Sequence, residues 1–280
     1  MHEELLTAAL AAAEAGARVL SRHFRSATLH VESKGRHDFV TEADRESEAV
    51  VVAEIRRRFP AHRILAEEGG GAGGEGDYEW LIDPLDGTTN FLHGLPVFCV
   101  SLACRRGSEL LAGVVEDPAG GNRFTATRGG GAQWNGAPMA VSAQAGLDGA
   151  FLATGYPFRA LPTLDLYLEV FREVFRQAKA IRRCGSAALD LAYTAAGVYD
   201  GFFEFRLSPW DLGAGVLLVE EAGGRVSDLD GGAGYFRGGN VVAGNPAVHR
   251  ALAEAVSHHV SEAALDRLNP IAPIAGAGAR

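Results

Sequence analysis

The order of helix and strand patterns changes near residue 145, and this change limits the folds open to the chain. Before it, two stretches with helical periodicity, 3–24 and 42–58, lead into a series of strand-like runs. After it, strand and helix patterns alternate up to about residue 260. We therefore predict an α+β half over residues 1–145 and an α/β half over residues 146–262. The Pro-, Gly- and Ala-rich end, 263–280, is predicted to be a flexible tail.

Short apolar runs bounded by turn residues mark the expected strands. In the first half they lie at 63–68, 80–82, 97–103, 110–115 and 124–127. In the second half they lie at 151–154, 180–182, 201–207, 225–229 and 240–243. Helices are expected at 163–178, 186–196, 209–221 and 246–260. The helix at 209–221 has the clearest start, because Ser208 can cap it and Pro209 occupies its first position.

Charge and cysteine content narrow the range of partners and locations. The 280 residues include 26 basic and 35 acidic side chains, which gives a net charge of −9. The longest basic run is Arg56–Arg58, so we expect no nucleic-acid surface. The three cysteines have no metal-ligand spacing, and no stretch of the chain is apolar enough for a signal or a membrane span. We expect reduced thiols, a cytoplasmic location and no membrane partner.

Carboxylates gather at the ends of strands and the starts of helices. Glu67 and Glu68 precede a glycine-rich loop, and Asp211 lies in the first turn of the helix at 209–221. The third group is Asp83-Pro84-Leu85-Asp86-Gly87-Thr88-Thr89, where an apolar strand is expected to end in the two aspartates. An Asp-Pro and Asp-Gly string can be an ordinary turn, and Asp211 can simply complement the helix dipole. The alternative is a site that binds a cation through the acids and an anion through the backbone N–H groups and hydroxyls of Gly87-Thr88-Thr89.

Four motifs in this order closely resemble the inositol monophosphatase family. They are Asp38-Phe39-Val40-Thr41-Glu42-Ala43-Asp44, Ala66-Glu67-Glu68, Trp80-Leu81-Ile82-Asp83-Pro84-Leu85-Asp86-Gly87-Thr88-Thr89-Asn90-Phe91, and Pro209-Trp210-Asp211 followed by Glu221-Ala222-Gly223-Gly224. The resemblance extends from about residue 5 to about residue 262. It implies a layered αβαβα sandwich, which agrees with the two halves predicted from the pattern.

The resemblance also implies two or three Mg²⁺ ions. In the family, residues that match Glu67, Asp83 and the Leu85 carbonyl hold one ion, residues that match Asp83, Asp86 and Asp211 hold a second, and Glu67 helps to hold a third. These oxygen ligands, with no His or Cys among them, are also what hard cations prefer.

The implied reaction is the hydrolysis of a phosphate monoester, most simply of inositol 1-phosphate to inositol and phosphate. The resemblance assigns catalytic roles to Glu67, Thr88 and Asp44, of which Asp44 and Thr88 orient a metal-bound water for in-line attack. It implies that the amides of Gly87 and Thr88 bind the phosphate. Gly185, Ala187, Glu204 and Asp211 are expected to bind the polyol. On local evidence alone, Glu204 could equally be an outward-facing acid on its strand.

Other activities remain open at this point. Relatives include fructose 1,6-bisphosphatases, 3′-phosphonucleotide phosphatases and histidinol phosphatases, although Thr89 stands where histidinol phosphatases tend to carry Lys. A partner-binding scaffold with vestigial catalysis is a further alternative. The resemblance also implies a homodimer and inhibition by lithium.

Overall fold

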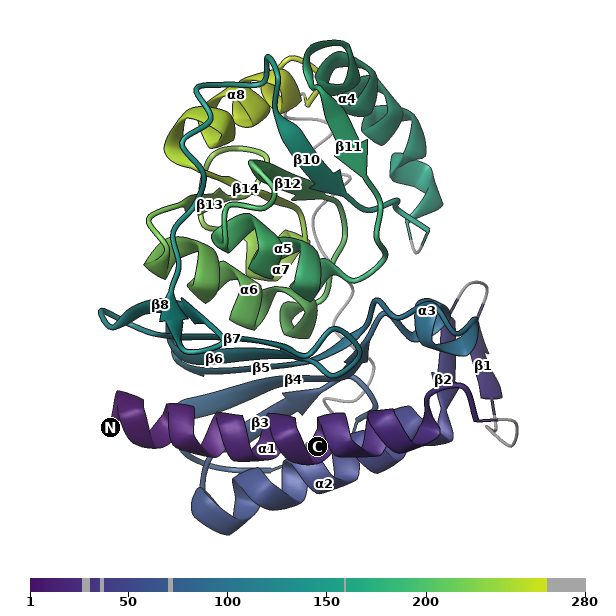
Figure 1. Cartoon of the computed structure of the whole chain (residues 1–280), viewed down its shortest axis with the longest axis vertical. Helices are drawn as coiled ribbons and strands as arrows, with labels where there is room; N and C mark the ends of the chain where they lie inside the picture. Colours follow the sequence, from purple (N-terminus) through teal and green to yellow (C-terminus); the bar gives the residue numbers. More distant parts are fainter. Residues whose placement is uncertain (27–30, 36–37, 70–72, 159, 261–280) are drawn as a thin grey trace.

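Helices and sheets stack in five layers (Figure 1). The computed structural model describes residues 1–26, 31–35, 38–69, 73–158 and 160–260. Helices α1 and α2 cover one face of a seven-stranded sheet, α5 and α6 lie between this sheet and a five-stranded one, and α4 and α8 cover the far side. The predicted layered αβαβα sandwich is therefore confirmed. The tail predicted at 263–280 lies outside the described residues.

The first layer consists of the two N-terminal helices, α1 (His2–His23) and α2 (Glu42–Arg58). Alanines and leucines at helical spacing bury one face of α1 against α2 and the sheet. Between the two helices, β1 (Val31–Gly35) pairs antiparallel with β2 (Asp38–Thr41). This hairpin was not predicted. Its strands are only five and four residues long and carry several polar residues, so they lack an apolar run.

The larger sheet has the simple order β3-β4-β5-β6-β7-β8-β9. Its strands are β3 (Arg63–Ala66), β4 (Tyr78–Asp86), β5 (Cys99–Arg106), β6 (Glu109–Asp117), β7 (Asn122–Thr127), β8 (Gly131–Trp134) and β9 (Ala137–Pro138). The sequence predicted that this strand ends in the two aspartates, and β4 does end at Asp86. Strand β4 continues to Asp86, which still pairs with Cys99, and only the register shifts between Asp83 and Asp86. The strand is thus irregular over the segment that carries both aspartates.

The smaller sheet has the order β11-β10-β12-β14-β13. Its strands are β10 (Phe151–Thr154), β11 (Ala180–Arg182), β12 (Gly201–Glu204), β13 (Arg225–Ser227) and β14 (Val241–Gly244). Strand β12 ends at Glu204 rather than at the predicted residue 207. Arg206 adopts a positive φ of 68°, a left-handed conformation that a strand cannot continue through.

The remaining helices are α3 (Thr88–Leu92), α4 (Leu164–Gln177), α5 (Ala187–Ala195), α6 (Pro209–Glu221), α7 (Tyr235–Gly238) and α8 (Pro246–Ser257), with a 3₁₀ turn at Leu161–Thr163. Helix α6 is buried along almost its whole length and packs closely on the larger sheet. A Cβ atom added at Gly213 would lie 2.8 Å from Leu81 Cδ1 and 2.9 Å from Ala103 Cβ. Glycine at this position therefore sets how near the helix lies to the strands.

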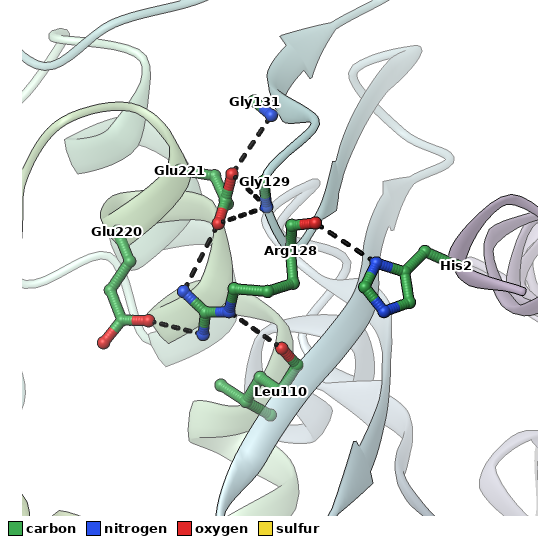
Figure 2. Close-up of polar contacts among 7 residues, drawn as sticks. All are labelled: His2, Leu110, Arg128, Gly129, Gly131, Glu220 and Glu221. Carbon is green, nitrogen blue, oxygen red and sulfur yellow. Dashed lines mark hydrogen bonds and ion pairs between the residues drawn. The ribbon is translucent and has the colours of Figure 1, made fainter.

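The C-terminal end of α6 is held by Arg128, in the turn between β7 and β8 (Figure 2). The guanidinium donates to Glu220, at 2.8 Å, and to Glu221, at 3.3 Å. Glu221 also accepts hydrogen bonds from the backbone N–H groups of Gly129 and Gly131. The carbonyl of Arg128 contacts His2 Nδ1 at 3.2 Å, so this cluster joins α1, the β7–β8 turn and α6.

None of the helices in the described part of the chain is both long and apolar enough to cross a bilayer.

Candidate active site

A pocket of about 340 Å³ is lined by residues at the ends of β4 and β12 and at the starts of α3, α5 and α6. Ten of the predicted site residues line it: Glu67, Asp83, Leu85, Asp86, Gly87, Thr88, Gly185, Ala187, Glu204 and Asp211. They come from segments that are far apart in the sequence, including β4, α3, α5, β12 and α6. Asp44 does not line the pocket itself. Its Oδ1 lies 3.3 Å from Thr88 Oγ1, so Thr88 connects it to the pocket.

Four acidic residues, Glu67, Asp83, Asp86 and Asp211, form what we call the inner end of this pocket. The charges of the other three shift the pKa of Asp83. Asp83 is buried, and burial together with the charges of Glu67, Asp86 and Asp211 raises its pKa well above the usual value. Burial and the charge of Asp211 raise the pKa of Asp86 to about 6. Carboxylates so close together repel one another unless a cation or a proton lies between them.

Asp86 is oriented by the N-terminus of α5. Ser186 Oγ donates to Asp86 Oδ2 at 2.6 Å, and the backbone N–H of Ala188 donates to the same oxygen at 2.8 Å. Ser186 is also the N-cap of α5, because its hydroxyl accepts from the N–H of Leu189. The positive end of the helix dipole thus faces the pocket and favours negative charge there.

Two more helix starts orient acidic side chains by capping. Ser208 N–H donates to Asp211 Oδ2 at 2.7 Å, at the start of α6. At the start of α2, Thr41 N–H donates to Asp44 Oδ2 at 2.8 Å, and the Thr41 hydroxyl donates to the same oxygen. Burial outweighs these hydrogen bonds and raises the pKa of Asp44 to about 6. A carboxyl with this pKa can take up a proton near neutral pH.

The backbone turns sharply between β4 and α3. Gly87 caps α3 with a φ of 94°, and a Cβ atom at this position would lie 2.8 Å from the Val97 carbonyl oxygen. Only glycine combines this conformation with this close approach. Next to it, Thr88 Oγ1 lies 3.1 Å from the Leu85 carbonyl oxygen and can donate either to it or to Asp44.

Four further lining residues, which we did not identify from the sequence, form what we call the outer end of the pocket. Tyr156, Phe158, Arg183 and Asp190 line it beside Glu204. The Arg183 guanidinium lies over the rings of Tyr156 and Phe158, 5.5 Å and 5.3 Å from their centroids. The sequence shows Asp190 as a single acid within an Ala- and Leu-rich helix, which was the one available indication of a special role.

The donor chemistry at the inner end fits magnesium. Among the described residues, no group of three His, Cys, Asp or Glu side chains already has a geometry that could hold a metal ion. However, the three charges that raise the pKa of Asp83 most belong to carboxylates, those of Glu67, Asp86 and Asp211. Such a set of oxygen ligands, joined by the Leu85 carbonyl in the same pocket, suits a hard divalent cation.

Comparisons with known proteins identify the family. The sequence profile of the inositol monophosphatase family matches residues 1–263, and the chain belongs to this family. It is 47% identical over 264 residues to Nus factor SuhB of Pseudomonas aeruginosa, covering 92% of this chain and 97% of that protein. It is 44% identical over 259 residues to inositol-1-monophosphatase of Mesorhizobium japonicum, covering 92% and 97% of the two chains. The crystal structure of extragenic suppressor protein suhB from Bartonella henselae superposes with a TM-score of 0.88 at 40% identity, covering 92% of this chain and 100% of that one.

Proposed function

We propose that this protein is a Mg²⁺-dependent phosphomonoesterase that hydrolyses inositol 1-phosphate or a related polyol phosphate. The observation that carries the proposal is the meeting of Glu67, Asp83, Asp86 and Asp211 in one pocket with the N-terminus of α5. Acids that attract a cation, next to amides that attract an anion, suit a metal-assisted phosphate site.

The pocket residues would divide the tasks of this reaction, and some of them would serve more than one. Glu67, Asp83 and the Leu85 carbonyl would hold one ion, and Asp83, Asp86 and Asp211 a second, with Glu67 available to a third. The ions, when bound, would neutralise charge on the phosphoryl and leaving oxygens. The backbone N–H groups of Gly87 and Thr88 would bind the phosphate.

Asp44 and Thr88 would orient the attacking water. The contact between Thr88 Oγ1 and Asp44 Oδ1 supports this role, and so does the pKa of about 6 at Asp44, which allows it to accept a proton. Gly185, Ala187, Glu204 and Asp211 would bind the polyol, since all four line the same pocket.

The direct test is Asp83→Asn. This change keeps the size of a buried side chain but removes the charge on which the proposed ions depend, so we expect phosphate release to fall at least about a hundredfold. Asp165→Asn, on the exposed surface of α4, serves as the matched control. Thermal unfolding of both variants reports whether the fold persists. Turnover by a folded Asp83→Asn protein at the wild-type rate would refute the proposed metal site.

A substrate panel at fixed Mg²⁺ tests which ester is preferred. We expect inositol 1-phosphate to be hydrolysed with a higher kcat/KM than fructose 1,6-bisphosphate, a 3′-phosphonucleotide or histidinol phosphate. Li⁺ is expected to inhibit the reaction. A preference of about a hundredfold for one of the other esters would replace the proposed substrate while leaving the reaction type in place.

A second function is favoured by the relatives themselves. The protein that is 47% identical to this chain is named a Nus factor, and this name states no phosphatase activity. A role through a macromolecular partner is therefore a second candidate, and our expectation of no nucleic-acid surface stays a prediction. In cells that lack the protein, rescue of growth by Asp83→Asn would separate such a role from catalysis.

We also propose that the chain forms a homodimer through α4 and the segment before it. Large apolar side chains are exposed there: Tyr156, Phe158, Leu161, Leu164, Leu168 and Phe175. The positions 161, 164, 168 and 175 fall on one face of the helix and its preceding turn. A contiguous apolar surface of this kind favours contact with another protein surface.

A further inference from the structure

A carboxyl group without a role in the proposed reaction lies in the wall of the pocket. Asp190, in the first turn of α5, is only 2% exposed, yet it lines the pocket together with Glu204. Its Oδ1 is buried and has no hydrogen-bond partner among the residues that the structure describes. A buried polar atom without a partner costs free energy and calls for an explanation, because most such atoms are satisfied in folded proteins.

The neighbours of Asp190 indicate what could satisfy it. Burial, together with the charges of Glu204 and Asp86, raises the pKa of Asp190, whereas Arg183 lowers it. Arg183 also contacts the rings of Tyr156 and Phe158 at the outer end of the pocket. Two carboxyl groups in this wall, beyond the residues proposed to hold phosphate, are suited to bind two hydroxyl groups.

We propose that Asp190 is a specificity residue that forms a hydrogen bond with a hydroxyl group of the substrate, different from the hydroxyl that Glu204 binds. This inference rests on the proposed phosphomonoesterase function and specifies its substrate class. The preferred leaving group is an alcohol that carries several further hydroxyl groups. An aromatic or simple alkyl leaving group can use the phosphate end of the pocket but leaves Asp190 unsatisfied.

Steady-state kinetics with two esters test this role. Asp190→Ala is expected to raise KM for inositol 1-phosphate about tenfold, with kcat within about twofold. For phenyl phosphate, whose leaving group offers no further hydroxyl, KM and kcat should both stay within about twofold. Asp190→Asn keeps the size of the side chain and its capacity for hydrogen bonds, so it should recover most of the lost affinity. Asp165→Ala, on the exposed surface of α4, is the matched control.

The possible outcomes separate the role proposed for Asp190 from the proposed phosphomonoesterase function. An equal rise in KM for both esters, or no rise for either, would overturn the role of Asp190. A change in the Mg²⁺ concentration needed for half-maximal rate would also overturn it, because Asp190 would then act through Asp86. Asp190→Ser replaces the alanine variant if thermal unfolding shows that the latter does not fold, and the same difference between the esters is expected. Wild-type protein that releases phosphate from neither ester, and from none of the other esters in the substrate panel, would instead refute the phosphomonoesterase function.

Discussion

Ser186 is the residue that joins helix capping to the acidic end of the pocket. Its hydroxyl caps α5 and donates to Asp86. We predict that Ser186→Ala lowers the free energy of unfolding by about 1–2 kcal/mol, the usual cost of losing an N-cap. The same change should raise the Mg²⁺ concentration needed for half-maximal phosphate release, because Asp86 loses an orienting donor.

Chemical denaturation and a Mg²⁺ titration measure these two effects. Ser186→Thr, which keeps a hydroxyl that can cap and donate, should restore both values. An alanine variant that matches the wild type in stability and in Mg²⁺ dependence would show that the contact between Ser186 and Asp86 has no energetic effect.

The raised pKa of Asp86 predicts a pH-dependent stability of the metal-free protein. The folded state holds the proton of this group up to about pH 6, whereas the unfolded chain releases it near 3.8. The folded state therefore binds more protons between these values, and the contribution of Asp86 to stability falls as the pH rises through this window. Asp86→Asn removes the titration, so wild type should lose stability relative to this variant between about pH 4 and pH 6.

Denaturation of the two proteins in the presence of a chelator, at several pH values, measures this difference. A difference that does not depend on pH would contradict the raised pKa. Added Mg²⁺ should stabilise the wild type more at about pH 7 than at about pH 5, since protons compete with the ion for the same carboxylates.

At the scale of elements, the position of α6 decides where Asp211 lies. The helix can lie close to β4 and β5 because Gly213 has no side chain. A Cβ atom at this position would collide with Leu81 and Ala103. We predict that Gly213→Ala lowers the free energy of unfolding by about 1–3 kcal/mol through overpacking. It should also raise the Mg²⁺ concentration needed for half-maximal phosphate release, because Asp211 lies only two residues before Gly213 and would be displaced with the helix.

Gly146→Ala is the matched control for this change. A Cβ atom at Gly146 would meet no other atom within 4 Å, and its φ is not positive. The control should keep the wild-type stability and Mg²⁺ titration. Equal behaviour of the two variants would show that α6 can move away from the sheet at no cost.

Most of the helices and strands could be predicted from the sequence, because their causes are local. Helices α2 and α6 begin directly after the N-cap residues Thr41 and Ser208, which form capping boxes with residues three positions further on. Short polar elements such as the β1–β2 hairpin were missed, since no apolar periodicity marks them. The end of β12 was placed too late, because the left-handed conformation of Arg206 cannot be read from an arginine.

Prediction from the sequence was incomplete for the candidate site as well. Motifs pointed to the acids that line the pocket, but Asp190 became visible only when α5 was placed between the two sheets. The packing that brings a residue of α5 beside Glu204 of β12 involves two segments with no shared motif. The functional roles assigned to all these residues remain predictions.

At the scale of the whole molecule, the exposed apolar face of α4 predicts a dimer. Analytical ultracentrifugation of the full chain should give twice the monomer mass. A Leu168→Glu and Phe175→Glu double variant places charges on side chains that are 43% and 61% exposed, so it should sediment as a folded monomer. A wild-type protein that is monomeric at all concentrations would contradict the proposal.

The layered arrangement has a consequence for how proteins with this architecture can diversify. The inner end of the pocket is made by β4, by Glu67 directly after β3 and by helix starts, and several of these side chains also cap helices or are buried in the interior. The outer end is made by a connecting segment, by the end of β12 and by one side of α5. Mutations at the inner end therefore alter folding and chemistry together. If the proposed roles hold, we expect mutations at 156, 158, 183 and 190 to change which substrate is accepted and to leave the metal-binding residues unchanged.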